Sequence, residues 1–301
     1  MNPLRMKVEI DSNSGFCGGV IRAIRSAENF LATHPEGSLH SLGAIVHNDS
    51  ELERLRSLGL RSIDYATLEK TTEADGRTLL IRAHGEPPST YRKAERAGFG
   101  IVDCTCPVVL ELQRSIREAY SAAGREGRGR RILIFGQIGH AETLGLLGQV
   151  NGDAVVIENA AMLEEAVRDG RIDVTRPVEI FSQTTKSPSD YADICARLDA
   201  LVPDIKVHNT ICTQVAARQK NLARFAASHD AVIFVSGKSS SNGKVLSALC
   251  RQVNPRTYHI ESASELEASW FHPGDRVGVC GATSTPRWLL EDVASKVLEI
   301  G

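Results

Sequence analysis

Three of the seven cysteines stand at comparable places, about one in each third of the chain. They are Cys17, Cys106 and Cys212, separated by 89 and then 106 positions. Each precedes a segment of helical character, and Cys106 is followed by Pro107, a residue favoured at the first position of a helix. Because the helix dipole and unpaired N–H groups stabilise a thiolate at such a position, all three suit metal ligation.

The spacing of these cysteines leaves two interpretations open, which are ligation by three distant thiolates and ordinary packing of buried cysteines. No CxxC pair is present, so neither a common zinc site nor a ferredoxin-type cluster is indicated. The odd count and the lack of an apolar N-terminal segment argue against a disulfide framework. Of the other cysteines, Cys195 and Cys250 fall on apolar helix faces, Cys280 ends a strand, and Cys104 adjoins Cys106.

A second pattern consists of six apolar runs of strand length, each ending in a polar or small residue and followed by helical periodicity. The strands are predicted at 39–46, 78–83, 131–135, 178–182, 231–235 and 276–280. The helices are predicted at 50–58, 89–97, 161–168, 189–201, 215–227 and 288–298. This alternation predicts parallel sheets covered by helices, with ligands bound beyond the carboxyl ends of the strands.

Each third of the chain holds two such strands and one of the three cysteines, which predicts a structural repeat. The expected fold class is α/β, with three lobes of small parallel-sheet α/β units in a pseudo-three-fold arrangement around a central cavity. We expect the lobes to cover 1–104, with Cys17, 105–208, with Cys106, and 209–301, with Cys212.

Groups able to bind an anion follow the predicted strands. His47, His84 and His140 follow the first three, and imidazole can hydrogen-bond phosphate, with charge if protonated. The last third carries neutral groups instead. These are Ser240, Ser241, Asn242 and Ser284. Such a set predicts a pocket for phosphate or diphosphate.

Glu142 follows His140 by two residues. A carboxyl group inside an anion pocket should have a raised pKa and could deliver protons. The alternative interpretation is an exposed glutamate in the first turn of a helix.

Composition excludes several partners. Lys and Arg number 35 against 37 Asp and Glu, a net charge of -2, so no basic excess indicates nucleic acid or anionic lipid. No apolar run approaches the ~20 residues of a membrane span, and we expect a cytoplasmic protein. The segment 237–244 differs from a P-loop in spacing, and Val245 replaces the magnesium-binding Ser or Thr.

Taken together, these motifs resemble the 4-hydroxy-3-methylbut-2-enyl diphosphate reductases over nearly the whole chain. The cysteine motifs match at 15–20, 103–107 and 211–212 with 218–219. The histidine motifs match at 46–48, 83–85 and 139–142 with 148–149. The threonine motif matches at 183–185, and the diphosphate-binding motifs match at 240–242 and 284–286.

The resemblance implies a 4Fe–4S cluster held by Cys17, Cys106 and Cys212, with the fourth iron free of protein ligands. It implies that His140 and Glu142 handle protons and that Thr184 orients the substrate hydroxyl. The implied diphosphate-binding residues are His47, His84, His140, Ser240, Ser241, Asn242 and Ser284.

The implied reaction is the reductive dehydroxylation of 4-hydroxy-3-methylbut-2-enyl diphosphate to isopentenyl and dimethylallyl diphosphate. In the family this is the last step of the methylerythritol phosphate route to isoprenoids. A ferredoxin or flavodoxin would supply the electrons one at a time.

The chain departs from the family pattern mainly in its last third. Val215 stands in Thr213-Gln214-Val215, where an Ala-Thr pair usually follows the third cysteine. Gly243 replaces a usual Ser or Thr, Gly281-Ala282-Thr283 replaces Ala-Gly-Ala, and Cys104 replaces a small or polar residue. Three alternatives follow: a divergent paralogue acting on a related allylic diphosphate, a non-catalytic sensor built on the cluster or the pocket, and a structural zinc protein.

Overall fold

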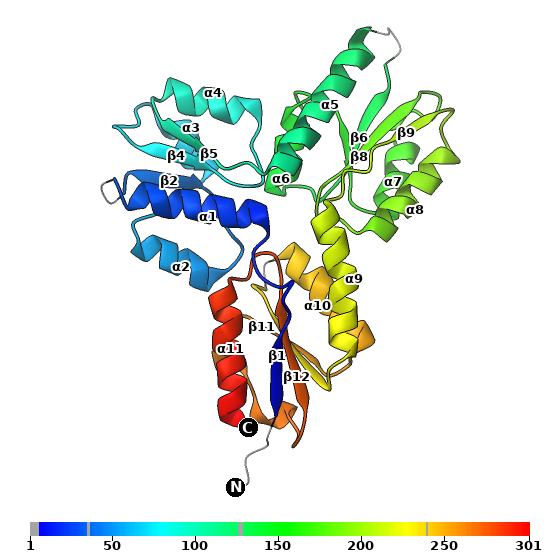
Figure 1. Ribbon diagram of the computed structural model, residues 1–301. Coiled ribbons are helices and arrows are strands. Elements are labelled where there is room, and N and C mark those ends of the chain that lie inside the picture. Colours follow the sequence, from blue (N-terminus) through cyan, green and yellow to red (C-terminus); the bar gives the residue numbers. More distant parts are fainter. Residues whose placement is uncertain (1–5, 35–36, 126–128, 239) are drawn as a thin grey trace. The chain divides into compact units, whose positions relative to one another are not determined.

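A computed structural model describes residues 6–34, 37–125, 129–238 and 240–301 (Figure 1). Within these residues, the strands form three four-stranded sheets, here called sheets A, B and C. The strand pairings with a described register are all parallel. The prediction of three small parallel-sheet α/β units is therefore confirmed.

Sheet B has the order β3-β2-β4-β5. Its strands are β2 (Leu39–Leu42), β3 (Arg61–Ile63), β4 (Thr78–Ile81) and β5 (Gly100–Asp103). Sheet C has the order β7-β6-β8-β9. Its strands are β6 (Arg131–Phe135), β7 (Val155–Ile157), β8 (Val178–Ser182) and β9 (Ile205–Val207). Sheet A has the order β1-β12-β10-β11. Its strands are β1 (Lys7–Ile10), β10 (Ala231–Val235), β11 (Thr257–Ile260) and β12 (Arg276–Gly281).

Helices connect these strands. Those between strands of one sheet are α2 (Asp49–Ser57), α3 (Tyr65–Lys70), α4 (Pro88–Arg96), α6 (Ala141–Gly148), α7 (Ala160–Arg168), α8 (Pro188–Asp199) and α10 (Ser241–Val253). Three helices lead from one sheet to the next, namely α1 (Gly18–Leu31), α5 (Pro107–Arg125) and α9 (Thr213–Ala227). The last helix is α11 (Arg287–Ile300). Within the described residues, no helix combines the length and the apolar composition that crossing a bilayer requires.

All three sheets share one topology. In sheets B and C, the first strand along the chain lies between the second and the third, and the fourth forms the edge beside the third. Sheet A has the same order if β1 is counted as its fourth strand, because β1 pairs with β12. The first strand of the chain therefore completes the sheet of the last third.

The chain divides into two compact units. Unit 1 comprises residues 1–36, 44–61 and 217–301, and unit 2 comprises residues 37–43 and 62–216. Sheet A lies in unit 1, and sheets B and C lie in unit 2 apart from Arg61. The lobe boundaries at 104 and 208 and the arrangement around a central cavity stay predictions.

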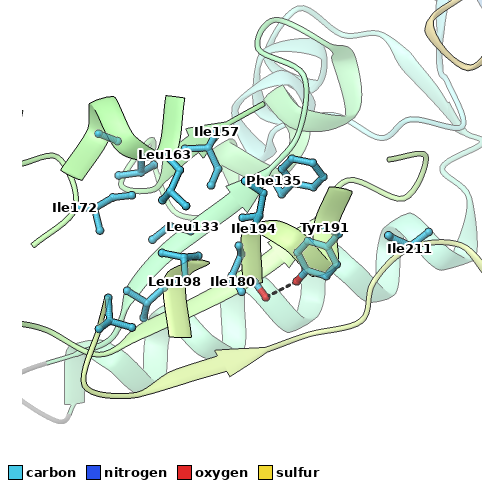
Figure 2. Packing of buried hydrophobic residues seen from close by; sticks show 14 residues of the cluster. Leu133, Phe135, Ile157, Leu163, Ile172, Ile180, Tyr191, Ile194, Leu198 and Ile211 are labelled. Atoms are coloured by element: carbon cyan, nitrogen blue, oxygen red, sulfur yellow. Dashed lines mark hydrogen bonds between the residues drawn. The ribbon is translucent and has the colours of Figure 1, made fainter. Parts of the chain in front are cut away.

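The central strands of sheets A and C are buried on both faces. In sheet C, Leu133 and Phe135 pack with α7 and α8, and Figure 2 shows that cluster. The alternate residues Ile132 and Ile134 pack with α5 and α6. The central strand β10 of sheet A alternates between α11 and the pair α9 and α10 in the same way. This double coverage explains the continuous apolar runs of the central strands, and it holds the polar loops that follow them in place.

Candidate functional site

The three cysteines occupy equivalent places in the shared topology. Each follows the fourth strand of a sheet: Cys17 follows β1, Cys106 follows β5 and Cys212 follows β9. Each directly precedes a helix, and its carbonyl oxygen accepts the N–H four residues on, at 2.9 to 3.0 Å. All three are half-buried and none is in a disulfide. The prediction that each stands at the start of a helix is confirmed.

In unit 1, the loop before Cys17 is tied to two other elements. The Ser14 hydroxyl accepts the Gly281 N–H at 2.9 Å, which joins the loop to the end of β12. The Arg218 guanidinium on α9 donates to the Gly15 carbonyl at 2.8 Å. Gly15 has φ +117°, a backbone conformation that L side chains rarely adopt. These bonds fix the backbone that presents the Cys17 thiol.

In unit 2, the other two cysteines are each bonded to the loop after the third strand of their sheet. The Cys106 N–H donates to the Ala83 carbonyl at 3.0 Å, directly before His84. The Cys212 N–H donates to the Thr184 carbonyl at 2.9 Å. Each cysteine is thereby joined to a loop that carries other predicted site residues. Cys104 is buried, one of the apolar core positions.

Glu142 is a buried carboxyl group, 2% exposed, in the first turn of α6. Its Oε1 accepts the Thr184 N–H at 2.7 Å, and its Oε2 accepts the Thr184 hydroxyl at 2.9 Å. Burial raises the pKa of Glu142 to about 7, although both bonds from Thr184 act in the opposite direction. The alternative of an exposed first-turn glutamate is therefore wrong, because the carboxyl is turned inward onto the loop after β8.

His140 caps the helix that carries Glu142. Its Nδ1 accepts the Glu142 N–H at 3.2 Å and lies 3.1 Å from the Gln183 amide nitrogen. The His84 ring lies edge-on to the His140 ring, with centroids 5.3 Å apart. Unit 2 thus brings together His84, His140, Glu142 and Thr184. Gln183 is a further residue of this group that we did not assign from the sequence, although its place at the end of a central strand was a usable signal.

His47 lies in unit 1, in the segment after β2. Its carbonyl is so close to Gly237, in the loop after β10, that a Cβ at that glycine would lie 2.7 Å from the His47 oxygen. The glycine therefore lets the two loops approach each other. The next residue, Asn48, caps α2 by accepting the Glu51 N–H at 2.9 Å.

The start of α10 gathers the other predicted residues of unit 1. The Ser240 hydroxyl caps the helix by accepting the Gly243 N–H at 3.0 Å, and it lies 3.4 Å from the Ser284 hydroxyl. The Asn242 amide donates to the Thr283 hydroxyl at 3.1 Å, and its buried Oδ1 has no hydrogen-bond partner among the described residues. The side chain of Ser241 lies outside the described residues. Apart from Ser241, the predicted neutral groups lie close together in unit 1.

At two positions where the chain departs from the family pattern, Gly243 and Thr283, the residue present fits a neighbouring side chain. A Cβ at Gly243 would overlap the Ser236 hydroxyl, so that hydroxyl fills the space a larger residue would need. Thr283 supplies the hydroxyl that Asn242 contacts. Val215, by contrast, is buried on α9, and nothing in the structure explains the loss of a hydroxyl there.

The fold of the chain is similar to that of two solved structures, each described as that of a diphosphate reductase. One is described as the structure of (E)-4-hydroxy-3-methyl-but-2-enyl diphosphate reductase, the terminal enzyme of the non-mevalonate pathway. It matches with a TM-score of 0.70 and 34% sequence identity, and the match covers 98% of this chain and 99% of that chain. A reductase from Plasmodium falciparum, at 24% identity and a TM-score of 0.80 over 96% of this chain and 87% of that one, shows the fold alone.

The family follows from the sequence matches. The family model described as LytB protein matches residues 8–298, and the chain belongs to that family. The relative from Parabacteroides distasonis is 45% identical, with 98% of each chain covered. One from Bacteroides fragilis is also 45% identical, with 97% of each covered. Both are named 4-hydroxy-3-methylbut-2-enyl diphosphate reductase.

Proposed function

We propose that the chain reduces 4-hydroxy-3-methylbut-2-enyl diphosphate to isopentenyl and dimethylallyl diphosphate, the last step of the methylerythritol phosphate route. Its membership of the LytB family and the names of its relatives support this proposal. The structural observation that carries it is the buried pair of Glu142, in the first turn of α6, and Thr184, in the loop after β8. A buried carboxyl group that can hold a proton near neutral pH suits the loss of a hydroxyl group as water.

The proposed cofactor is a 4Fe–4S cluster held by Cys17, Cys106 and Cys212. The donor set fits such a group, because none of the three cysteines is in a disulfide, and all three are half-buried and at helix starts, where a thiolate is stabilised. When bound, the cluster supplies electrons one at a time and an iron site free of protein ligands. A ferredoxin or flavodoxin is the proposed electron donor.

The overall reaction replaces a C–O bond by a C–H bond and consumes two electrons and two protons. Glu142, in its protonated form, supplies the proton with which the hydroxyl leaves as water. Thr184 positions that carboxyl, since its N–H and its hydroxyl contact one carboxyl oxygen each. The same hydroxyl is the group that can orient the substrate's own hydroxyl.

The proposed diphosphate-binding residues fall into two sets, and each set suits an anion in its own way. In unit 2, His84 and His140 offer ring N–H donors. In unit 1, the start of α10 offers backbone N–H groups and the positive end of a helix dipole, together with uncharged side chains. The proposed binding residues are His47, His84, His140, Ser240, Ser241, Asn242 and Ser284.

The first experiment is anaerobic reconstitution followed by turnover. Reconstituted protein should contain about four iron and four sulfide per chain, and it should reduce the allylic diphosphate with a one-electron donor. Cys17→Ser should lose iron, whereas Cys195→Ser, at another half-buried cysteine, should keep it. Folded protein that binds zinc tightly and no iron would show that the proposal is wrong.

The substrate is tested in the same assay with several allylic diphosphates. Preference for 4-hydroxy-3-methylbut-2-enyl diphosphate supports the proposal, and preference for another compound supports the divergent paralogue. Binding without turnover supports the sensor.

A further inference from the structure

Gln183 is held between the ends of the two central strands of sheet C. The residue is 2% exposed and follows β8. Its side-chain Oε1 accepts the backbone N–H of Gln137, in the loop after β6, at 2.9 Å. Since a backbone N–H can only donate, this bond fixes the orientation of the amide, with its oxygen toward Gln137. The Thr143 hydroxyl is a second donor to the same oxygen, at 3.4 Å.

The other end of the amide is therefore its NH₂ group. It donates to the Thr185 hydroxyl and to Nδ1 of His140, each at 3.1 Å. Nδ1 of His140 also receives the backbone N–H of Glu142 at 3.2 Å. Two donors meet at one ring nitrogen, so that nitrogen must present its lone pair. A neutral imidazole then carries its one proton on Nε2.

We propose that Gln183 is a positioning residue that fixes His140 as the neutral tautomer protonated on Nε2, so that the ring donates to the diphosphate through Nε2. This inference rests on the proposed diphosphate-binding role of His140. A proton on Nδ1 would face two N–H donors, so the arrangement also opposes the doubly protonated ring. The nearby titratable groups in unit 2 are His84, which lies edge-on to the ring, and Glu142, whose carboxyl is bonded to Thr184.

The family resemblance gives His140 two roles, diphosphate binding and proton handling, and a ring held by Gln183 keeps only the first. A ring fixed as a neutral donor binds phosphate oxygen but does not exchange protons through Nδ1. Proton delivery then falls to Glu142, two residues further along the same helix start.

Nitrogen NMR on anaerobically prepared protein with ¹⁵N-labelled histidine tests the tautomer directly. Comparison with His140→Asn assigns the resonances. At neutral pH, the wild type should show Nδ1 without a proton and Nε2 with one. Gln183→Glu places a carboxylate oxygen against Nδ1, so that nitrogen should gain a proton. Gln183→Met, of similar size but without a donor, should give a mixture of both tautomers.

Thr143→Val is the matched control. It removes the weaker donor to the Gln183 oxygen and leaves the Gln137 N–H in place, so the tautomer should not change. Inorganic diphosphate is the binding probe, and Gln183→Met should weaken its binding about twofold, the effect of a ring that is in the binding tautomer about half of the time.

A wild-type ring protonated on Nδ1, or a Gln183→Glu protein with the wild-type tautomer, would overturn the inference. These spectra need neither substrate nor turnover. If the tautomer is as expected and no allylic diphosphate is reduced, the proposed function fails and the role of Gln183 in fixing the ring stands.

Discussion

The loops after the central strands of sheet C and those after the central strands of sheet A share one topology and differ in chemistry. Two of the predicted site residues of sheet C, His140 and Glu142, are titratable, and the carboxyl group of Glu142 is buried. The predicted site residues at the corresponding strand ends of sheet A are uncharged: Ser240, Asn242 and Ser284. The shared strand order places polar side chains at the same point of each sheet. The ability of a strand end to donate or accept a proton depends on which residue lies there and on how deeply its side chain is buried.

Exchanging a carboxyl for an amide at Glu142 tests this comparison most strongly. Glu142→Gln keeps the shape and removes the proton donor, so we expect kcat to fall by roughly 10²–10⁴-fold. Binding of inorganic diphosphate should change little, because the uncharged groups of unit 1 are untouched. Steady-state turnover and diphosphate titration check both statements. A variant with normal kcat would show that the carboxyl is not the proton source.

The pH dependence of turnover gives the next largest effect. Burial raises the pKa of Glu142 to about 7, so the protonated form is lost as the pH rises through that value. We therefore expect kcat to fall above pH 7, approaching about tenfold per pH unit, as for one required proton. A pH profile that is flat between pH 6 and 9 would contradict this.

The same pKa shift affects stability with a defined sign. The folded-state pKa of about 7 lies above the ordinary carboxyl value of 4.5, so the contribution to folding is fully present below pH 4.5. It is lost as the pH rises from 4.5 through 7. Urea unfolding of the wild type and of Glu142→Gln across that range isolates this contribution, because the amide does not titrate.

The six strands that were predicted are the two central strands of each sheet. They are continuous apolar runs because helices cover both faces, as the fully buried β8 and β10 show. The edge strands were not predicted, because they are short and partly exposed. β9, for example, has only Ile205, Lys206 and Val207. Two of the predicted runs, 39–46 and 78–83, extend beyond their strands, since β2 ends at Leu42 and β4 ends at Ile81.

Part of the candidate site was predictable because the apolar runs also locate the strand ends. The positions of His84, His140 and Glu142 follow from strand ends, which the apolar runs locate. Contacts between side chains far apart in sequence do not leave such a pattern. The bond from Gln183 to His140 and the fit of Gly243 against Ser236 became visible only in the folded chain.

Gly243 offers a stability test on the sheet A side of the comparison. A methyl group there would overlap the Ser236 hydroxyl, so Gly243→Ala should destabilise unit 1 by about 1–3 kcal/mol. Chemical denaturation measures the change. Adding Ser236→Gly should recover much of the loss. Gly124→Ala on α5, where nothing lies within 4 Å of the new methyl, should be neutral or slightly stabilising. Equal losses for both alanine variants would show that the Ser236 contact is not the cause.

The smallest effect is expected at Thr283, whose hydroxyl accepts the Asn242 amide at 3.1 Å. Thr283→Val keeps the side-chain shape and removes that acceptor. The Asn242 amide, a proposed diphosphate-binding group, is then no longer held in one orientation. One lost hydrogen bond corresponds to about a twofold to tenfold rise in KM, with kcat unchanged. Thr283→Ser, which keeps the hydroxyl, should restore the wild-type KM. A fall in kcat at constant KM would instead show that Thr283 acts in the chemical step, as proposed for Glu142 in sheet C. The chemical contrast between the two sheets would then be wrong.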